Sequence, residues 1–240
     1  MSCVLPVSGM IVELDFVAIN ELASAESLAY LTRYDSTHGR FPGEVRLGEN
    51  SLNVDTAVNS YDIEILSLSA LIEREWQERR VDIVLDCSGE YGSQQLAQKH
   101  IAAGAGQVLL SYPGESDISA IVYGVNQNAT SLHQSVLSAA SCTSNALIPV
   151  VSELDNAFGI DSGVITTVHA SMHDQPVIDA YHSDDLRKNR AASQSVIPVA
   201  TELAMGVGRI IPALENKFIA HALRVPVNNV SALNVTLNLQ

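Results

Sequence analysis

Two residue types that act together in covalent catalysis, a cysteine and a histidine, follow each other in the second half of this sequence. Cys142 lies in SAASCTSNALIP, where small and hydroxylated residues surround one thiol and an apolar run follows. His169 ends the stretch VITTVH, 27 residues later. A thiolate attacks carbonyl carbon, and an imidazole can take up the proton that is released. The pair therefore suggests a thiol nucleophile with a histidine base.

The position of Cys142 depends on an expected helix at 143–158. Ser141, Thr143 and Ser144 are good helix-capping residues. The positive end of a helix dipole favours the thiolate form of a nearby cysteine. The apolar face of this helix consists of Ala146, Leu147, Val150, Val151 and Leu154.

Other interpretations of the pair remain open at this point. A lone cysteine in such a setting is more often a small buried residue than a catalytic one. One helix and the returning strand GVITTVHAS can bring His169 beside Cys142, but such a pair also fits a thiol hydrolase, and the histidine alone fits a satisfied core residue.

The first half of the chain alternates between strand and helix patterns. DFVAIN at 15–20 reads as a strand before the helical ELASAESLAYLTRYD, and residues 39–55 turn repeatedly as a β-hairpin does. VDIVLDCSG at 81–89 is a buried strand, followed by the helical SQQLAQKHIAAGA and the strand QVLLSYP. This order predicts an α/β fold with a doubly wound, Rossmann-type sheet.

Ligands of such sheets bind beyond the carboxyl ends of the strands. Asn20, Glu21, Ser88 and Gly89 follow two of the predicted strands and are the candidate cofactor-binding residues. Glu21 is placed to hold a ribose hydroxyl of a dinucleotide. The alternative is that Glu21 only favours the start of a helix through its charge.

The pattern changes near Cys142, so we expect one domain at 1–141 and a second, α+β domain at 142–240. The tail FIAHALRVPVNNVSALNVTLNLQ alternates like sheet strands. AMGVGRI at 204–210 looks like part of a glycine-rich phosphate loop, but no predicted strand precedes it and Pro212 follows. We expect a helix end there.

Composition limits the class of protein. The 240 residues are 47% hydrophobic, which allows a sizeable core, and a formal charge of -14 argues against nucleic acid as a partner. The three cysteines, Cys3, Cys87 and Cys142, show no C-x-x-C spacing, so neither a disulfide framework nor a metal site is suggested. Because no long apolar run and no secretory signal occur, we expect a cytoplasmic protein without a membrane segment.

Several motifs together resemble one family. SAASCTSN with TTVHA, LTRYDSTHGRF, HIAAGAGQVLLS, YGVNQ and LRVPVNNVS resemble the phosphorylated-aldehyde dehydrogenases of the glyceraldehyde-3-phosphate dehydrogenase family, over nearly the whole chain from Asp15. MHDQPVIDAYHSDDLRKNRAASQSVIPV is more similar to the D-erythrose-4-phosphate dehydrogenase branch, which acts early in pyridoxal phosphate synthesis.

The resemblance implies an NAD-dependent oxidation of a small phosphorylated aldehyde. Cys142 would add to the aldehyde, His169 would take the hydroxyl proton, and a thioester would remain on Cys142. Water releases the acid in erythrose-4-phosphate enzymes, whereas inorganic phosphate releases the product in the glycolytic enzyme. The resemblance also implies a homotetramer for a complete chain.

The resemblance further implies residues that hold anions. Ser141 and Thr143 flank the nucleophile, while Lys188, Thr201 and Arg224 match residues that hold the substrate phosphate or the attacking anion; Arg187 is adjacent. HSDDLRKN contains what looks like one extra residue, and Lys188 stands where relatives usually have arginine. Six of the 13 basic residues lie in this region: Arg187, Lys188, Arg190, Arg209, Lys217 and Arg224.

The chain also departs from the family at its ends. Members begin with a strand and a glycine-rich turn that cradles the cofactor pyrophosphate, and nothing like G-x-G-x-x-G precedes DFVAIN. The sequence stops at Gln240, inside the expected catalytic sheet. We therefore expect both domains to be incomplete and NAD binding to be weak. The competing hypothesis is an inactive remnant that acts only through protein association.

Overall fold

The computed structural model describes residues 14–68, 75–90, 92–128 and 133–240. The chain divides into two compact units, Met1–Leu110 and Ser111–Gln240. The domain boundary expected after residue 141 stays a prediction. Cys3 and the segment before Leu14, where no glycine-rich turn was found, lie outside the described residues.

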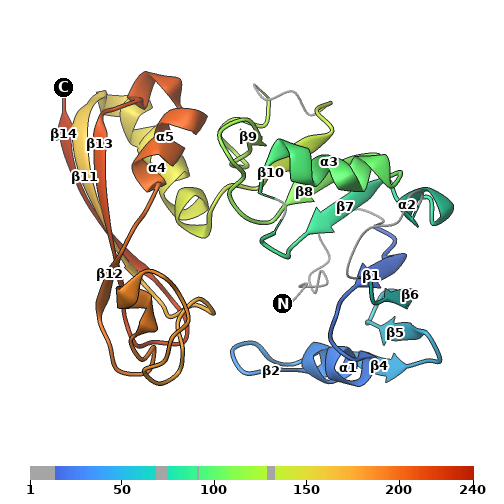
Figure 1. Cartoon of the computed structure of the whole chain (residues 1–240). Coiled ribbons are helices and arrows are strands. Elements are labelled where there is room, and N and C mark those ends of the chain that lie inside the picture. The colour runs from blue at the N-terminus through green and yellow to red at the C-terminus, as the bar shows by residue number, and fades with distance from the viewer. Residues whose placement is uncertain (1–13, 69–74, 91, 129–132) are drawn as a thin grey trace. The chain divides into compact units, whose positions relative to one another are not determined.

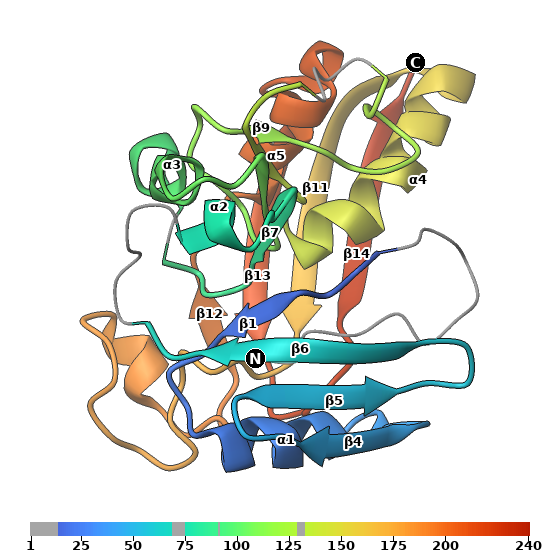
Figure 2. The same cartoon turned by 90° about the vertical axis from the view of Figure 1, so that its right-hand side faces the viewer.

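The first unit begins with a four-stranded sheet in the order β1-β6-β5-β4. Its strands are β1 (Ala18–Asn20), β4 (Glu44–Leu47), β5 (Ser51–Asp55) and β6 (Ser60–Leu66). Figure 2 shows α1 (Ala25–Arg33) along this sheet. β1 and β6 are parallel, whereas β4 and β5 form the predicted hairpin. The small pair β2 (Tyr34–Asp35) and β3 (Gly39–Arg40) follows α1.

A second group of elements in this unit has the strand, helix, strand order that the sequence predicts. It consists of α2 (Glu75–Glu78), β7 (Ile83–Asp86), α3 (Gln94–Ala102) and β8 (Gln107–Leu110). β7 and β8 are parallel neighbours, as in a βαβ unit. The predicted α/β class is therefore confirmed. β1 and β7 belong to different sheets, however, so the described strands do not form one continuous doubly wound sheet.

The second unit is built on β11 (Ile160–His169), one of the two inner strands of its main sheet (Figure 1). β11 is parallel to β13 (Phe218–Arg224) and antiparallel to β14 (Ala232–Leu239). β12 (Ile197–Val199) adds to the outer edge of β13. These strands and the helices confirm the predicted α+β character. The smaller elements are β9 (Ser119–Ala120), β10 (Val136–Ser138), η1 (Leu186–Asn189) and η2 (Pro212–Leu214).

Two helices cover one face of this sheet, α4 (Cys142–Phe158) and α5 (Leu203–Ile210). The buried residues between helices and sheet include Ile148, Ile165 and Val207, all 0% exposed. A Cβ on Gly206 would lie 3.2 Å from Ser144 Oγ, so this glycine lets the two helices approach closely. The AMGVGRI stretch is therefore helical and not a phosphate loop.

One part of the expectation for AMGVGRI was wrong, because the short strand β12 does precede α5. Its three residues carry little periodic signal, so the sequence pattern did not reveal it. Among the described helices, none is long and apolar enough to cross a membrane.

Candidate active site

The structure places the thiol of Cys142 and the imidazole of His169 side by side. Cys142 Sγ lies 3.5 Å from His169 Nε2. α4 begins at Cys142, one residue before the predicted start, and the side chain of Ser141 caps it by accepting a hydrogen bond from Ser144 N at 2.9 Å. β11 ends at His169. The helix start and the strand end therefore bring together two residues that are distant in sequence.

The hydrogen bonds of His169 define which ring nitrogen faces the thiol. Nδ1 lies 2.8 Å from the carbonyl oxygen of Ala170. A carbonyl can only accept, so Nδ1 carries the hydrogen, and in the neutral ring Nε2 keeps its lone pair. That lone pair is on the side of Cys142 Sγ, where it can accept the thiol proton.

The surroundings of Cys142 leave it accessible to a small reactant. Cys142 is exposed and His169 is half-buried. The unpaired N–H groups at the start of α4 stabilise negative charge that develops near the thiol. An exposed thiol, an adjacent base and a helix start together support nucleophilic addition to a carbonyl carbon.

Two of the predicted anion-binding residues, Lys188 and Arg224, are held by one carboxylate. Lys188 Nζ lies 2.8 Å from Asp174 Oδ2, and Arg224 Nη1 donates to Asp174 Oδ1. Arg224 is buried, and it stands opposite His169 in the parallel register of β11 and β13. The cations are thus close to the thiol–imidazole pair along the sheet, with their charge partly neutralised.

The carboxyl of Asp174 has a pKa below its ordinary value. Partial burial would raise this pKa, but the hydrogen bonds and charges of Lys188 and Arg224 lower it by more. A depressed pKa in the folded state contributes stability above the unfolded-state pKa, and this contribution is lost as the pH falls through the folded-state pKa.

We predict that Asp174→Asn lowers the free energy of unfolding at neutral pH by about 1–2 kcal/mol. The loss is smaller than for a fully buried ion pair because the Asp174 side chain is 40% exposed and water screens it. The difference from wild type should shrink as the pH falls through the lowered pKa of Asp174, because the carboxyl then becomes protonated and loses its charge. Urea unfolding of both proteins across this range measures it.

Asp185→Asn is the matched control. The pKa of Asp185 is also lowered, by hydrogen bonds from Arg187, but the side chain of Arg187 is 52% exposed whereas that of Arg224 is 7% exposed. We expect the Asp185→Asn variant to unfold at nearly the wild-type urea concentration. Equal destabilisation by the two substitutions would contradict the special role of Asp174.

Within the described residues, the other predicted anion-binding residues do not bind Asp174. They pair with another aspartate, line a cavity or belong to the start of α4. Arg187 binds Asp185 through Nε and Nη2, each at 2.9 Å. Arg187 and Thr201 line a cavity of about 480 Å³ beside β12 and β13. Thr143 Oγ1 lies 3.1 Å from Ser141 Oγ. The structure thus groups Arg187 with Thr201, Lys188 with Arg224, and Ser141 with Thr143.

The remaining basic residues of this region also have partners within the chain. Arg190 pairs with an aspartate at 2.7 Å, and Lys217 donates to the Ile160 carbonyl at 2.7 Å. Arg209 donates to three backbone carbonyls, those of Gly114, Glu115 and Ile118. All six basic residues of the region are therefore bound to acceptors of the same chain, and the two that bind only carbonyls serve the structure.

The candidate cofactor residues lie in the first unit, after β1 and β7. The Asn20 amide exchanges two hydrogen bonds with the Leu68 backbone, which occupies its donor and its acceptor. Glu21 Oε1 accepts from the backbone N–H groups of Leu22 and Ala23. Ser88 N and Oγ both donate to Asp86 Oδ1. Asn20 and Glu21 are therefore on one sheet and Ser88 on the other.

Gly89 and Glu21 are the residues of this set that fit a dinucleotide best. Gly89 has a φ of 80°, and nothing lies within 4 Å of the position that a Cβ would take, so a ligand can approach its backbone closely. Only Oε1 of the Glu21 carboxylate accepts hydrogen bonds from the described residues, and Ser24, not Glu21, caps α1, so the predicted role of Glu21 at a ribose hydroxyl stays a prediction. The amide of Asn20 fits less well, because Leu68 already uses it.

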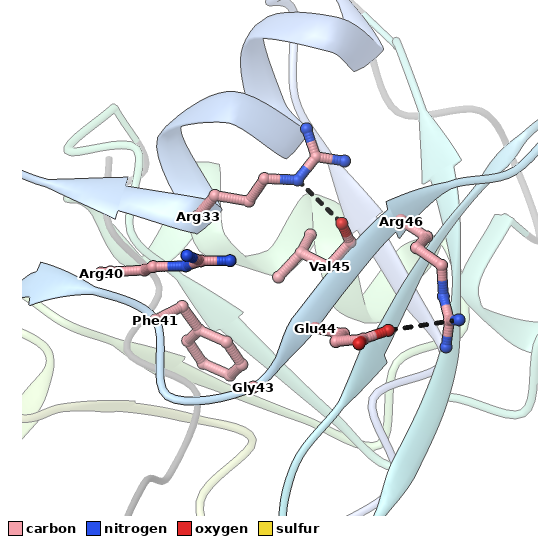
Figure 3. Close-up of a pocket in the computed structure, with 7 residues that line it drawn as sticks. All are labelled: Arg33, Arg40, Phe41, Gly43, Glu44, Val45 and Arg46. Atoms are coloured by element: carbon pink, nitrogen blue, oxygen red, sulfur yellow. Dashed lines mark hydrogen bonds and ion pairs between the residues drawn. The ribbon is translucent and has the colours of Figure 1, made fainter.

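Another cavity of the first unit, of about 210 Å³, lies between α1 and β4 (Figure 3). Arg33 Nε donates to the Val45 carbonyl at 2.8 Å, and Arg46 pairs with Glu44 at 3.3 Å. Arg40 lines the same cavity, so it contains charges of both signs. None of the candidate cofactor residues lines it.

Asp174, which links Lys188 to Arg224, was not among the residues predicted from the sequence. Its only signal was a position within the polar segment after His169, and no spacing rule connects an aspartate to cations so far along the chain. Within the described ranges, no group of three metal-ligating side chains is placed to hold a metal ion.

Two family models match this chain. The model described as "Glyceraldehyde 3-phosphate dehydrogenase, NAD binding domain" matches residues 4–94. The model described as "Glyceraldehyde 3-phosphate dehydrogenase, C-terminal domain" matches residues 141–240. The two matches follow each other in the order of that family and cover most of the chain, and the second includes both Cys142 and His169.

Proposed function

The chain belongs to the glyceraldehyde 3-phosphate dehydrogenase family of NAD-dependent dehydrogenases, and from that premise we propose that it oxidises D-erythrose 4-phosphate to 4-phosphoerythronate. The observation that carries the proposal is the 3.5 Å contact between Cys142 Sγ and His169 Nε2 inside the region that matches the C-terminal domain model. NAD, when bound, accepts the two electrons that the aldehyde loses.

In this proposal the residues of the chain hold the reacting carbon and move its protons. His169 Nε2 takes the proton of Cys142, the thiolate adds to the aldehyde carbon, and His169 returns the proton to the aldehyde oxygen, which forms a thiohemiacetal. His169 then accepts the hydroxyl proton as that carbon is oxidised to a thioester on Cys142. Glu21 and the turn at Gly89 hold the cofactor. Water attacks the thioester and releases the acid together with free Cys142.

Two observations support water, and not inorganic phosphate, as the final acceptor. The segment from Met172 to Val199 resembles the erythrose-4-phosphate branch of the family. Phosphorolysis also needs a second anion site for the attacking phosphate. The basic residues of this region are bound within the chain, with Lys188 and Arg224 sharing Asp174 and Arg187 held by Asp185, which favours one anion site over two.

The test is NADH formation by the purified chain with erythrose 4-phosphate or glyceraldehyde 3-phosphate, each with and without inorganic phosphate. We expect turnover of erythrose 4-phosphate in the absence of phosphate, at NAD concentrations high enough to offset the weak NAD binding expected from the sequence. A strict phosphate requirement, with preference for glyceraldehyde 3-phosphate, would establish the glycolytic alternative. Folded protein that turns over neither aldehyde would favour the third hypothesis, an inactive chain that acts by protein association.

The proposal extends to assembly and location. Val164 and Ile219 face each other in the register of β11 and β13 and are 44% and 61% exposed. They point away from the face that α4 and α5 cover, because Ile165 and Ala220 pack on that side. An apolar sheet face of this kind supports self-association, and we propose a homotetramer. The phosphorylated substrate supports a cytoplasmic location.

A further inference from the structure

The backbone just before Cys142 adopts a conformation that few residues tolerate. Ala140 has a φ of 58°, in the left-handed region that normally favours glycine. It is buried and lies two residues before the nucleophile. Neighbouring groups must hold a non-glycine residue in such a conformation, because the isolated chain would leave it.

Ser138 holds this turn from within the unit. Its side chain is 0% exposed, and its hydroxyl donates to the Tyr112 carbonyl at 2.7 Å. The same oxygen accepts from Ala140 N at 3.0 Å and Gly114 N at 3.2 Å. The amide of the strained residue is therefore fixed by a buried hydroxyl.

Asn145 holds the turn from the other side. Its Nδ2 donates to the carbonyls of Ala139 at 2.7 Å and Ser141 at 2.9 Å. These are the carbonyls on either side of Ala140, so one side-chain amide spans the strained residue. The Ser141 carbonyl also accepts from the backbone N–H of Asn145 at 3.0 Å, within the first turn of α4.

We propose that Asn145 is a positioning residue that keeps Cys142 Sγ within reach of His169 Nε2. The 3.5 Å separation fits a hydrogen bond between sulfur and nitrogen, and a displacement of the 139–142 backbone by about 1 Å would break this contact. Asn145 acts on Cys142 only through the backbone of its neighbours. The inference rests on the proposed function, in which Cys142 is the nucleophile.

The experiment compares the alkylation rate of Cys142 by iodoacetamide near neutral pH in wild type, Asn145→Ala and Asn145→Ser. Mass spectrometry of the labelled peptide separates Cys142 from Cys3 and Cys87. We expect Asn145→Ala to slow labelling by about tenfold or more, because Cys142 loses its base. Asn145→Ser keeps one donor in an exposed position and should be intermediate.

Asn126→Ala is the matched control. The Asn126 amide also binds the backbone of the second unit, donating to the Ala120 carbonyl at 2.9 Å and accepting from Val122 N at 2.8 Å. We expect this variant to lose stability but to label at the wild-type rate within about twofold, because the Asn126 amide donates to Ala120 and accepts from Val122 and, within the described part of the chain, makes no direct hydrogen bond to residues 138–142.

A double substitution separates positioning from general loosening. In a His169→Asn background the base is already absent, so Asn145→Ala should cause little further slowing, whereas independent effects would multiply. If the two substitutions slow labelling independently, or if folded Asn145→Ala protein labels at the wild-type rate, the role of Asn145 is overturned. The proposed function is not affected by either result. Equal labelling of Cys142, Cys87 and Cys3 in the wild-type protein would overturn the proposed nucleophile, and this inference with it.

Discussion

Cys142→Ser is expected to lower aldehyde oxidation by about a thousandfold or more and to leave no acyl group on the protein. A serine hydroxyl in the same place is a far weaker nucleophile than a thiolate, although its size and the helix cap are retained. Intact-protein mass spectrometry after mixing with erythrose 4-phosphate and NAD detects the thioester, and NADH absorbance gives the rate.

Cys87→Ser is the control for this prediction. Cys87 is half-buried just after β7 in the first unit, and its Sγ lies 3.9 Å from the Leu85 carbonyl. We expect the Cys87→Ser variant to form the thioester and to keep most of the wild-type rate. Thioester formation in folded Cys142→Ser protein would show that another residue is the nucleophile.

The second large effect concerns His169. We expect His169→Asn to slow aldehyde oxidation by about 10²–10⁴-fold, the usual contribution of a positioned general base. An asparagine side chain can form hydrogen bonds but has no basic nitrogen to receive the protons of Cys142 and of the thiohemiacetal. Imidazole added to the solution should restore part of the rate, because it supplies the missing base.

His221→Asn tests whether a histidine elsewhere on the same sheet matters. His221 is exposed on β13 and stands opposite Thr166 of β11, three residues before His169. We expect the His221→Asn variant to oxidise the aldehyde at the wild-type rate, with no change when imidazole is added. An unchanged rate of aldehyde oxidation in the His169→Asn variant would exclude His169 as the base.

The sequence was sufficient to predict the elements that carry the reacting residues. Small, hydroxylated residues before a periodic apolar face indicated a capped helix at Cys142, and the apolar run before His169 indicated a strand. Both predictions concern short stretches whose patterns are local. From the sequence, the meeting of the two side chains was only a hypothesis, and the structure places them 3.5 Å apart.

The other features of the site depend on contacts between distant parts of the chain, which local sequence patterns do not encode. Nothing in the periodicity links Asp174 to Lys188 and Arg224, because their meeting depends on how η1 and β13 are placed. The left-handed conformation of Ala140 was equally invisible, since alanine rarely adopts it and only the surrounding hydrogen bonds impose it.

The placement of β11 also has a consequence for the timing of reactivity during protein synthesis. β11 obtains its sheet partners from β13 and β14, which are translated after both Cys142 and His169. Until those strands dock, β11 lacks the sheet hydrogen bonds that hold His169 at the start of α4. If Cys142 is the nucleophile, we expect its reactivity to appear only after β13 and β14 have paired with β11.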